Sequence, residues 1–475
     1  MYHRIVVLMI SFVLSVFNGF CQDITGQLDI AIQKLSSDPQ FKHAIISLYV
    51  INSNTGKVIF DKNGQLGLSP ASCQKVVTSV TAFELLGNGF QYKTYIGYDG
   101  KIDKTNLKGK LFLTGRGDPT FGSDRWNSTS EAVVLKKILN ILQKNKIQAV
   151  AGDLVCNDTQ FTNEPLPNGW VWEDMGNYYG TGAWGFNWQE NKFDVTFKTG
   201  KIINDITEII STMPPSLLMD YTFANFVRTG SKGSGDNAYL FSSPFHKNII
   251  ARGTVPISEK GFAISGSMPD PPGIFIKRLN GYLKENGITV AGGAWSNSGR
   301  QVNNQTTGVP VVHVDSILSP RLDSINYWFL KKSVNLFGEA FVKTIAFQRS
   351  NIGSTDSGIA IIRDFWGKRG IEKSALKMID GSGLSPANRV TTHSLVTVMQ
   401  YALGRSWFAA FYNALPEMNG IKMKDGYIGG VRSYTGYLKG KNGIEYTFAF
   451  IVNNFDGNAG TVREKMWKVL AVMDN

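Results

Sequence analysis

The sequence has 475 residues, of which 43% are hydrophobic and 18% charged, so it excludes a disordered chain and has room for two or three domains with their own cores. Lysine and arginine exceed the acidic residues by 49 to 37, which gives a formal net charge of +12. The positive charge is scattered and no basic run is longer than Lys331-Lys332, so nucleic acid is not an expected partner.

An apolar stretch from Ile5 to Phe17 follows a basic start and ends near the small residues Gly19 and Cys21. A membrane-spanning helix needs about 18–20 apolar residues, more than this stretch offers. We therefore expect residues 1–21 to be a cleaved secretory signal. The mature protein is then periplasmic or secreted, and it keeps no integral membrane segment.

Cys73 and Cys156 remain after signal cleavage, so a cysteine-stapled scaffold is excluded. Whether these two thiols pair in an oxidising compartment is left open. The five histidines show no ligand spacing such as HExxH, and we expect neither a metal site nor a cofactor.

The first elements after the signal are a helix over 24–35, a hairpin with strands at 44–52 and 57–61, and an apolar helix over 72–86 that ends at Gly87. From about residue 92 the sequence pattern changes to short β-rich segments with many turns, and it contains one clear helix over 130–143. This indicates an inserted region over 92–271, with room for two nested subdomains.

Helical periodicity resumes after the predicted insert, and the chain closes with two strands and a helix. The predicted helices are 274–286, 324–347, 358–368, 394–403 and 462–473, and the strands are 426–437 and 444–453. We therefore expect one discontinuous α/β domain, built from 22–91 and 272–475, that the insert interrupts.

Ser72 and Lys75 are three residues apart at the start of the apolar helix, so both side chains lie on one face. The helix dipole favours developing negative charge on the hydroxyl, and a desolvated lysine can take its proton. Ser374 and Lys377 have the same spacing, and a capped helix start is the ordinary explanation of such a pair. The very apolar helix after Ser72 indicates a buried position and favours catalysis there.

Ser333 and Asn335 place a hydroxyl and a carboxamide on the predicted helix 324–347. The hydroxyl could relay a proton to a leaving amine, and the amide could hold a peptide group of the substrate. Ser324 and Asn326 repeat the pattern, and a solvated helix face is the alternative.

A lysine on a strand, followed by glycine, would let an extended substrate lie against the strand edge. Lys198-Thr199-Gly200 has this form, but it precedes Ser333 and lies in the predicted insert, so we interpret it as a hairpin turn. Lys424-Asp425-Gly426 opens the last predicted hairpin. It follows the Ser72/Lys75 pair and the Ser333/Asn335 pair in the chain, which is the order expected of the three motifs.

These motifs, with five further segments, resemble the class C low-molecular-mass penicillin-binding proteins, which are serine-type D-alanyl-D-alanine carboxypeptidases/endopeptidases. The resemblance covers nearly the whole mature chain. Its supporting segments are 70–78, 117–120, 152–154, 169–175 and 380–385 with Asn388. It implies a transpeptidase/β-lactamase-like α/β domain, in which a central, mainly antiparallel sheet has helices on both sides and a large β-rich region interrupts the chain.

The resemblance also implies a serine mechanism. Ser72 attacks the carbonyl of the penultimate D-alanine of a peptidoglycan stem peptide, and Lys75 is the general base. Ser333 passes the proton to the departing amine, and Asn335 binds the substrate backbone. Lys424 supplies positive potential for the terminal carboxylate.

Further residues complete the implied site. Backbone amides of Ser72 and Tyr427 form an oxyanion hole, and Gly426 lets the substrate lie along the strand. Asp174 matches the acidic member of a subsite for the diamino acid. β-Lactams would trap the acyl-enzyme, because their ring nitrogen cannot leave.

The chain departs from the family pattern at three positions. Asp425 replaces a small hydroxyl residue that would bind the substrate carboxylate, and an anion at about 4 Å repels another by roughly 1–4 kcal/mol. Pro386 and Gly429 replace an arginine and a glutamine that help to read the diamino acid, so Arg389 is a substitute candidate. These departures motivate one alternative, a non-catalytic peptidoglycan-binding scaffold. A β-lactamase remains as a second enzyme alternative.

Overall fold

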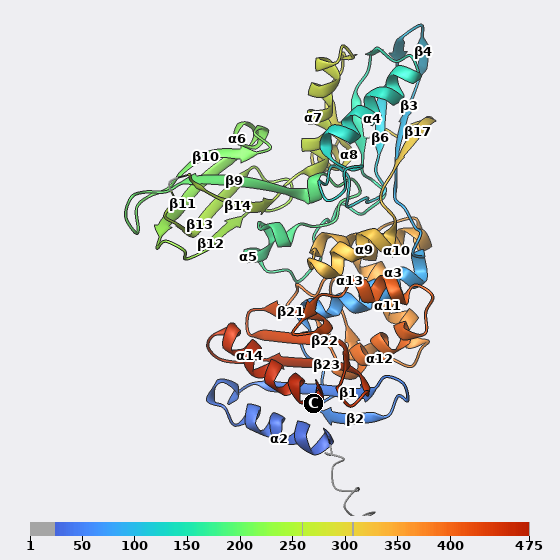
Figure 1. Cartoon of the computed structure of the whole chain (residues 1–475). Coiled ribbons are helices and arrows are strands. Elements are labelled where there is room, and N and C mark those ends of the chain that lie inside the picture. The colour runs from blue at the N-terminus through green and yellow to red at the C-terminus, as the bar shows by residue number, and fades with distance from the viewer. Residues whose placement is uncertain (1–23, 259, 306–307, 475) are drawn as a thin grey trace, which may run out of the picture.

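The computed structural model describes residues 24–258, 260–305 and 308–474 (Figure 1). The expected signal peptide, residues 1–21, lies outside this part of the chain. Among the described residues, none of the helices combines the length and the apolar character that a bilayer crossing requires.

Both ends of the chain build one six-stranded antiparallel sheet, the main sheet. β1 pairs with β23 along its whole length, from Ile45 opposite Asn453 to Asn52 opposite Tyr446. This arrangement confirms the predicted N-terminal hairpin and the mainly antiparallel central sheet. In spatial order the strands are β2 (Val58–Lys62), β1 (Ile45–Asn52), β23 (Glu445–Asn453), β22 (Val431–Lys439), β21 (Ile421–Ile428) and β20 (Glu417–Met418).

The single strand predicted over 426–437 is wrong, because a turn at Gly429 and Gly430 divides this segment into β21 and β22. Gly430 has a φ of +70°, which residues with a Cβ rarely adopt. Lys424 lies opposite Thr435, in the middle of β21 rather than at the opening of a hairpin. β20 pairs only with Ile421 and Lys422, so among the described strands none covers the outer edge of β21 beyond Met423.

Helices cover both faces of the main sheet because its strands are apolar on both faces. Leu48 and Val50 of β1 pack with α2 (Ile24–Ser36) and α14 (Ala459–Leu470), whereas Tyr49 and Ile51 belong to the core of α3 (Lys75–Leu86) and α12 (Thr392–Leu403). Figure 1 shows α2 and α14 beside the sheet and the other helices beyond it. The predicted α/β class, with helices on both sides of the sheet, is confirmed.

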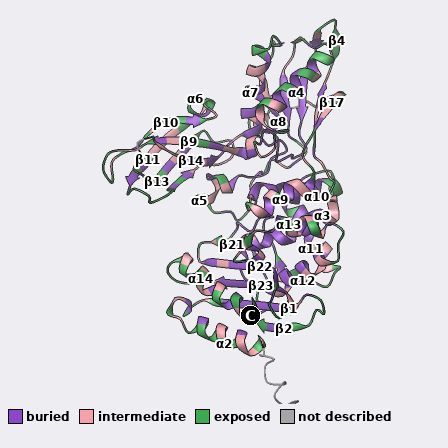
Figure 2. Cartoon of the chain, viewed as in Figure 1, coloured by how far each residue is buried: buried purple, intermediate pink, exposed green. Residues whose placement is uncertain are grey.

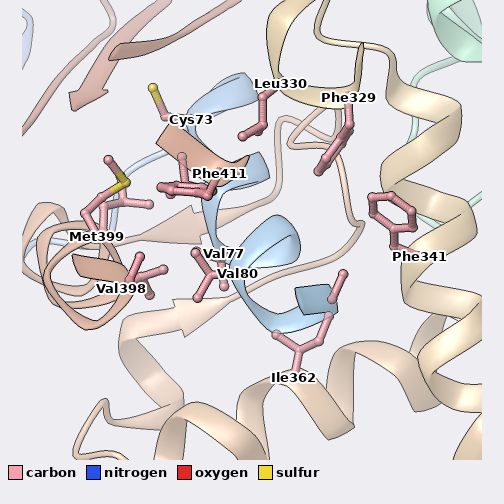
Figure 3. Packing of buried hydrophobic residues seen from close by; sticks show 14 of the residues in the cluster. Cys73, Val77, Val80, Phe329, Leu330, Phe341, Ile362, Val398, Met399 and Phe411 are labelled. Carbon is pink, nitrogen blue, oxygen red and sulfur yellow. The ribbon is translucent and has the colours of Figure 1, made fainter. Parts of the chain in front are cut away.

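α3 is the central helix of this arrangement. Every residue from Lys75 to Phe83 is buried, and the helix contacts α9 (Leu322–Lys331), α10 (Asn335–Ser350), α11 (Thr355–Gly367) and α12. The helix predicted over 72–86 starts differently, because its first turn is the 3₁₀ helix η2 (Ala71–Gln74). Figure 3 shows Val77 and Val80 of α3 together with apolar side chains of its neighbours, which include Phe329, Phe341, Ile362, Val398, Met399 and Phe411.

The continuous helix predicted over 324–347 is wrong. Ser333 has a left-handed φ of +55° and separates α9 from α10. The break places Asn335 at the N-terminus of α10, where its side chain bonds to the central helix and to the residues around Tyr179. These tertiary bonds favour the break over the continuous helix that apolar spacing suggests. α13 (Phe408–Ala414), which the sequence did not predict, packs against α9.

The region between α3 and α9, residues 93–318, has its own apolar core, and we call it the inserted unit. β3 pairs with β17 over Lys93 to Tyr98, so the inserted unit ends at Leu318 rather than at residue 271. α7 (Pro271–Glu285), which the sequence assigned to the catalytic domain, belongs to this core because Phe275 stacks on Phe186 at 4.4 Å.

Within its described residues, the inserted unit contains four sheets. Two form its body with α4 (Glu131–Lys144), α7 and α8 (Asn297–Val302), and the other two form a lobe on the left of Figure 1 with α6 (Ser216–Asp220). The first body sheet has the strand order β16 (Ala294–Ser296), β8 (Leu154–Asn157), β6 (Leu111–Thr114), β3 (Lys93–Tyr98) and β17 (Val312–Leu318). The second body sheet has the order β15 (Thr289–Val290), β7 (Ala149–Val150), β5 (Asn106–Lys108) and β4 (Lys101–Asp103). The first lobe sheet has the strand order β10 (Glu208–Met213), β9 (Lys192–Lys198) and β14 (Phe262–Ser267). The second lobe sheet has the order β11 (Thr222–Gly230), β13 (Asn248–Pro256) and β12 (Asn237–Phe241).

Three features lie at the margins of these units. The short helix α5 (Trp172–Met175) lies between the lobe and β21 in Figure 1, and β18 (Leu376–Lys377) pairs with β19 (Arg389–Val390). Lys198 ends β9 and pairs with Glu208 of the antiparallel β10 at 3.8 Å, as its interpretation as part of a hairpin turn predicted. Figure 2 shows that buried residues concentrate in the main sheet, the helices around α3 and the body of the inserted unit.

Candidate active site

Ser72 lies in the 3₁₀ turn η2, directly before α3. The preceding Ala71 has a φ of +45°, a left-handed conformation that costs a residue with a Cβ about 1–2 kcal/mol. The turn is held from outside by Gly383, where a Cβ would collide with the Ala71 carbonyl. The strained turn and the close backbone approach together fix the position of the Ser72 hydroxyl.

Lys75 contacts three oxygen atoms with its Nζ, which lies 2.9 Å from Ser72 Oγ, 2.6 Å from Asn335 Oδ1 and 2.8 Å from the Ser382 carbonyl oxygen. The side chain is fully buried, and none of the described carboxylates forms an ion pair with it. Burial and, next, repulsion from Lys424 lower the pKa of Lys75 to about 7. A large fraction of this lysine is therefore an uncharged amine at neutral pH.

The three contacts suit an uncharged Lys75. A neutral amine has two N–H donors and one lone pair, and two of its neighbours, Asn335 Oδ1 and the Ser382 carbonyl, only accept hydrogen bonds. The third neighbour, the Ser72 hydroxyl, can donate its proton to the lone pair. The 2.9 Å separation therefore lets an uncharged Lys75 accept the Ser72 proton.

Asn335 links Lys75 to the inserted unit, because its Nδ2 donates to the Tyr179 carbonyl oxygen at 2.7 Å. Ser333 lies two residues earlier, in the break between α9 and α10. Its side chain is half-buried, and within the described residues its hydroxyl forms no hydrogen bond. The structure thus brings Asn335 to Lys75, but it does not bring the Ser333 hydroxyl into hydrogen-bond contact with either site lysine.

Lys424 is buried, and its Nζ donates to the backbone carbonyl of Asp425 at 2.7 Å and to Asp425 Oδ1 at 2.9 Å. The opposing charges form an ion pair on adjacent residues of one strand. Burial would raise the pKa of Asp425, but attraction to Lys424 and Arg432 outweighs it and holds that pKa below its ordinary value. Asp425 is therefore ionised at neutral pH.

Gly426 of β21 lies against the turn that holds Ser72. A Cβ at this position would lie 2.8 Å from both Ser72 N and the Pro70 carbonyl oxygen, so only glycine fits. Met423 N bonds to the Pro416 carbonyl on the outer side of the strand. Because N–H groups alternate sides along a strand, the Tyr427 amide points to that same outer edge.

Asp174 lies on α5 and is half-buried. Burial, followed by repulsion from Glu173, raises the pKa of Asp174 to about 6, while a hydrogen bond from the Tyr179 side chain acts in the opposite direction. Since the backbone carbonyl of Tyr179 accepts from Asn335, a path of three contacts, through Tyr179 and Asn335, connects Asp174 to Lys75. Arg389 donates to the carbonyl oxygens of Pro386 and Asn388, so its guanidinium is held in its own loop.

The sequence did not single out Asp380 as part of the site, although it lies within the 380–385 motif. Its buried carboxylate accepts hydrogen bonds from the backbone amides of Gly383 and Ser385, and it orients the Ser382 carbonyl that binds Lys75. The remaining donors come from three side chains, Gln74, Trp170 and Asn388. The motif match identified the segment, but the role of Asp380 in orienting the Ser382 carbonyl is visible only in the fold.

Two buried charges on α10 were also missed. Glu339 accepts from the Gly381 amide, and burial together with the nearby Asp380 raises the pKa of Glu339 well above its ordinary value. Lys343 donates to the carbonyl oxygens of Glu164 and Ala183, and burial lowers the pKa of Lys343 to about 8. Their spacing in the sequence could have revealed them, since two ionisable residues four positions apart on a buried helix need partners.

Cys73 is a packed thiol whose Sγ lies 3.2 Å from the Lys424 carbonyl oxygen, and burial raises the pKa of Cys73 to about 12. Cys73 and Cys156 are both free and lie in different cores. Over the described ranges, the histidine, cysteine and acidic side chains form no cluster that could hold a metal ion.

Comparisons with known proteins identify the family of the chain. The family model described as D-Ala-D-Ala carboxypeptidase 3 (S13) matches residues 28–472. A D-alanyl-D-alanine carboxypeptidase from an Actinomadura species is 25% identical over 459 residues, which cover 90% of this chain and 81% of that protein. The D-alanyl-D-alanine carboxypeptidase DacB of Haemophilus influenzae is 23% identical over 430 residues, which cover 85% and 84%.

The fold is also that of a solved protein. The crystal structure of penicillin-binding protein 4 from Haemophilus influenzae matches with a TM-score of 0.79 at 21% identity, over 94% of this chain and 99% of that chain. A structure of the same protein complexed with a β-lactam matches with a TM-score of 0.74 at 20% identity and the same coverage. With a family model that spans nearly the whole chain, the protein belongs to the D-Ala-D-Ala carboxypeptidase 3 (S13) family of serine-type peptidases, as the sequence predicted.

Proposed function

We propose that this serine DD-peptidase hydrolyses the D-Ala-D-Ala bond of peptidoglycan stem peptides, and D-Ala-diamino acid cross-links, through an acyl-enzyme on Ser72. The observation that carries the proposal is the 2.9 Å contact between Ser72 Oγ and a buried Lys75 that is free of an ion pair among the described residues. A non-catalytic scaffold has no need for an uncharged lysine at this position, so the scaffold alternative is not favoured.

In the acylation step, Lys75 accepts the Ser72 proton as Oγ attacks the carbonyl carbon of the penultimate D-alanine. The new C–O bond pushes electrons onto the carbonyl oxygen, and the amides of Ser72 and Tyr427 donate to that oxyanion. The C–N bond then breaks, and the leaving amine takes the proton that Lys75 holds. Water subsequently hydrolyses the ester, with Lys75 again as the base, and releases Ser72.

Ser333 is the proposed relay for the proton to the leaving amine. Its hydroxyl has no hydrogen bond to a described residue, so it is available to the substrate. Asn335 holds the substrate backbone and also fixes Lys75. Asp174, the half-buried acid on α5, is the proposed contact for the amino group of the diamino acid side chain.

β-Lactams acylate Ser72 in this proposal, and their ring nitrogen stays tethered so that it blocks the entry of water. The secretory signal expected over residues 1–21 supports a periplasmic location, where the polymer substrate lies. A β-lactamase would instead release the opened lactam rapidly, and stable labelling distinguishes the two activities.

The first prediction concerns the identity of the nucleophile. We expect Ser72→Ala to abolish covalent labelling by fluorescent penicillin, measured in a denaturing gel. Ser374→Ala is the matched control, because Ser374 has the same spacing to a lysine but lies on the exposed turn η5 (Lys373–Ala375), and it should label like the wild type. Labelling of Ser72→Ala at the wild-type level would refute the assignment.

The second prediction concerns the protonation state of Lys75. Only the uncharged amine can take the Ser72 proton, and the pKa of Lys75 is about 7. The rate of acylation by penicillin should therefore rise about 10-fold per pH unit below that pKa and level off above it. Lys75→Ala should remove this limb and slow acylation by about 10²–10⁴-fold. A wild-type rate that is constant from about pH 5 to about pH 9 would contradict a lysine base.

The third prediction tests the Tyr427 amide. Tyr427→Pro deletes an N–H that faces the outer edge of β21, and loss of an oxyanion donor slows acylation by about 10²–10³-fold. Tyr427→Ala keeps the amide and removes only the exposed ring, so its acylation rate should stay close to that of the wild type. Equal rates for the two variants, with circular dichroism showing both folded, would exclude this amide from the oxyanion hole.

A further inference from the structure

The ion pair between Lys424 and Asp425 changes what the edge of β21 can bind. The Lys424 side chain is 1% exposed and the Asp425 side chain is 39% exposed. The Asp425 carboxylate is therefore the more accessible member of the pair. The next residue, Gly426, borders Ser72 N, so this pair lies beside the nucleophile.

Counting hydrogen-bond donors makes the consequence specific. An ammonium group has three N–H donors, and Lys424 uses two of them on Asp425, one on the backbone carbonyl and one on Oδ1. One donor remains for a ligand. The second carboxylate oxygen of Asp425 is an acceptor, and no described side chain other than Lys424 donates a hydrogen bond to Asp425.

The other charge near this pair belongs to Arg432 on β22, whose guanidinium lies 5.2 Å from the centre of the Tyr427 ring. Its charge helps to keep Asp425 ionised. Arg432 therefore stabilises the anion at this edge. A substrate carboxylate placed here would have to approach Asp425 at short range, where like charges repel.

We propose that the leaving-group pocket of this enzyme recognises a neutral carboxamide in place of a free carboxylate, with Asp425 as the specificity-determining residue; the inference rests on the proposed DD-peptidase function. A carboxamide has one acceptor oxygen and two N–H donors. Its oxygen takes the remaining Lys424 donor, and its N–H donates to Asp425. The preferred substrates are D-alanyl peptides whose leaving D-residue is amidated.

The reaction itself is unchanged. Ser72 forms the ester with the D-alanyl carbonyl, the C–N bond to the amidated residue breaks, and the amine leaves with the proton that Lys75 carried. β-Lactams bear a carboxylate beside the ring nitrogen, so they acylate the wild type more slowly than a variant with a hydroxyl residue in place of Asp425.

The test uses the mature chain and two stem peptides that end in D-Ala-D-Ala, one with a free carboxylate and one with a terminal carboxamide. kcat/KM is measured for both by mass spectrometry of the products. For the wild type we expect a ratio that favours the amide by about 5-fold or more, since one like-charge contact at about 4 Å in water corresponds to about that factor. Asp425→Thr should reverse the preference, and the nearly isosteric Asp425→Asn should abolish it.

Each outcome decides the inference. A wild type that prefers the carboxylate peptide, or a ratio that Asp425→Thr leaves unchanged, overturns it. A carboxylate preference that Arg432→Gln removes would assign that recognition to Arg432 and also overturns it. If neither peptide is cleaved and penicillin does not label Ser72, the proposed function is refuted. If the peptides are cleaved with the opposite preference, only the inference about Asp425 is refuted.

Discussion

A buried lysine without a carboxylate partner is the constraint on which the rest of this site depends. Lys75 is fully buried beside the similarly buried Lys424, and the hydrogen-bond contacts of its Nζ with described residues are two carbonyl-type oxygens and one hydroxyl. A charged ammonium is costly in such surroundings, so the uncharged amine becomes accessible near neutral pH. If a carboxylate occupied the position of the Asn335 amide, an ion pair would keep Lys75 protonated and the Ser72 hydroxyl would lose its base.

Four segments that are distant in the sequence have to converge to maintain that environment. The turn η2 supplies Ser72, the N-terminus of α10 supplies Asn335, and the 380–385 segment supplies the Ser382 carbonyl. The inserted unit contributes as well, because the Tyr179 carbonyl holds Asn335 and the Trp170 indole donates to Asp380. The unit that interrupts the catalytic fold is therefore part of the structure that positions the base.

The sequence predicted the residues whose roles follow from short-range spacing, and it missed those that depend on tertiary contacts. The spacing of Ser72 and Lys75 on a very apolar helix predicted that their side chains lie together, and they are in contact. The contact of Asn335 with Lys75 was not predicted, because it depends on the tertiary fold. The break at Ser333 was missed, because apolar periodicity continues across it while the Asn335 hydrogen bonds override it. The end of the inserted unit at Leu318 was missed as well, because α7 is as amphipathic as a helix of the main domain and only its stacking on Phe186 reveals its core.

Proton transfer from Ser72 requires that Lys75 be uncharged in the free enzyme. The most direct measurement is an NMR titration of the mature protein with ¹³C-labelled lysine side chains, in which the Lys75 resonance is assigned by its absence from Lys75→Arg. We expect an apparent pKa for Lys75 near 7, well below the ordinary lysine value of about 10.4. An apparent pKa for Lys75 of about 10 would show that the lysine is charged at neutral pH and would contradict its role as the base for Ser72.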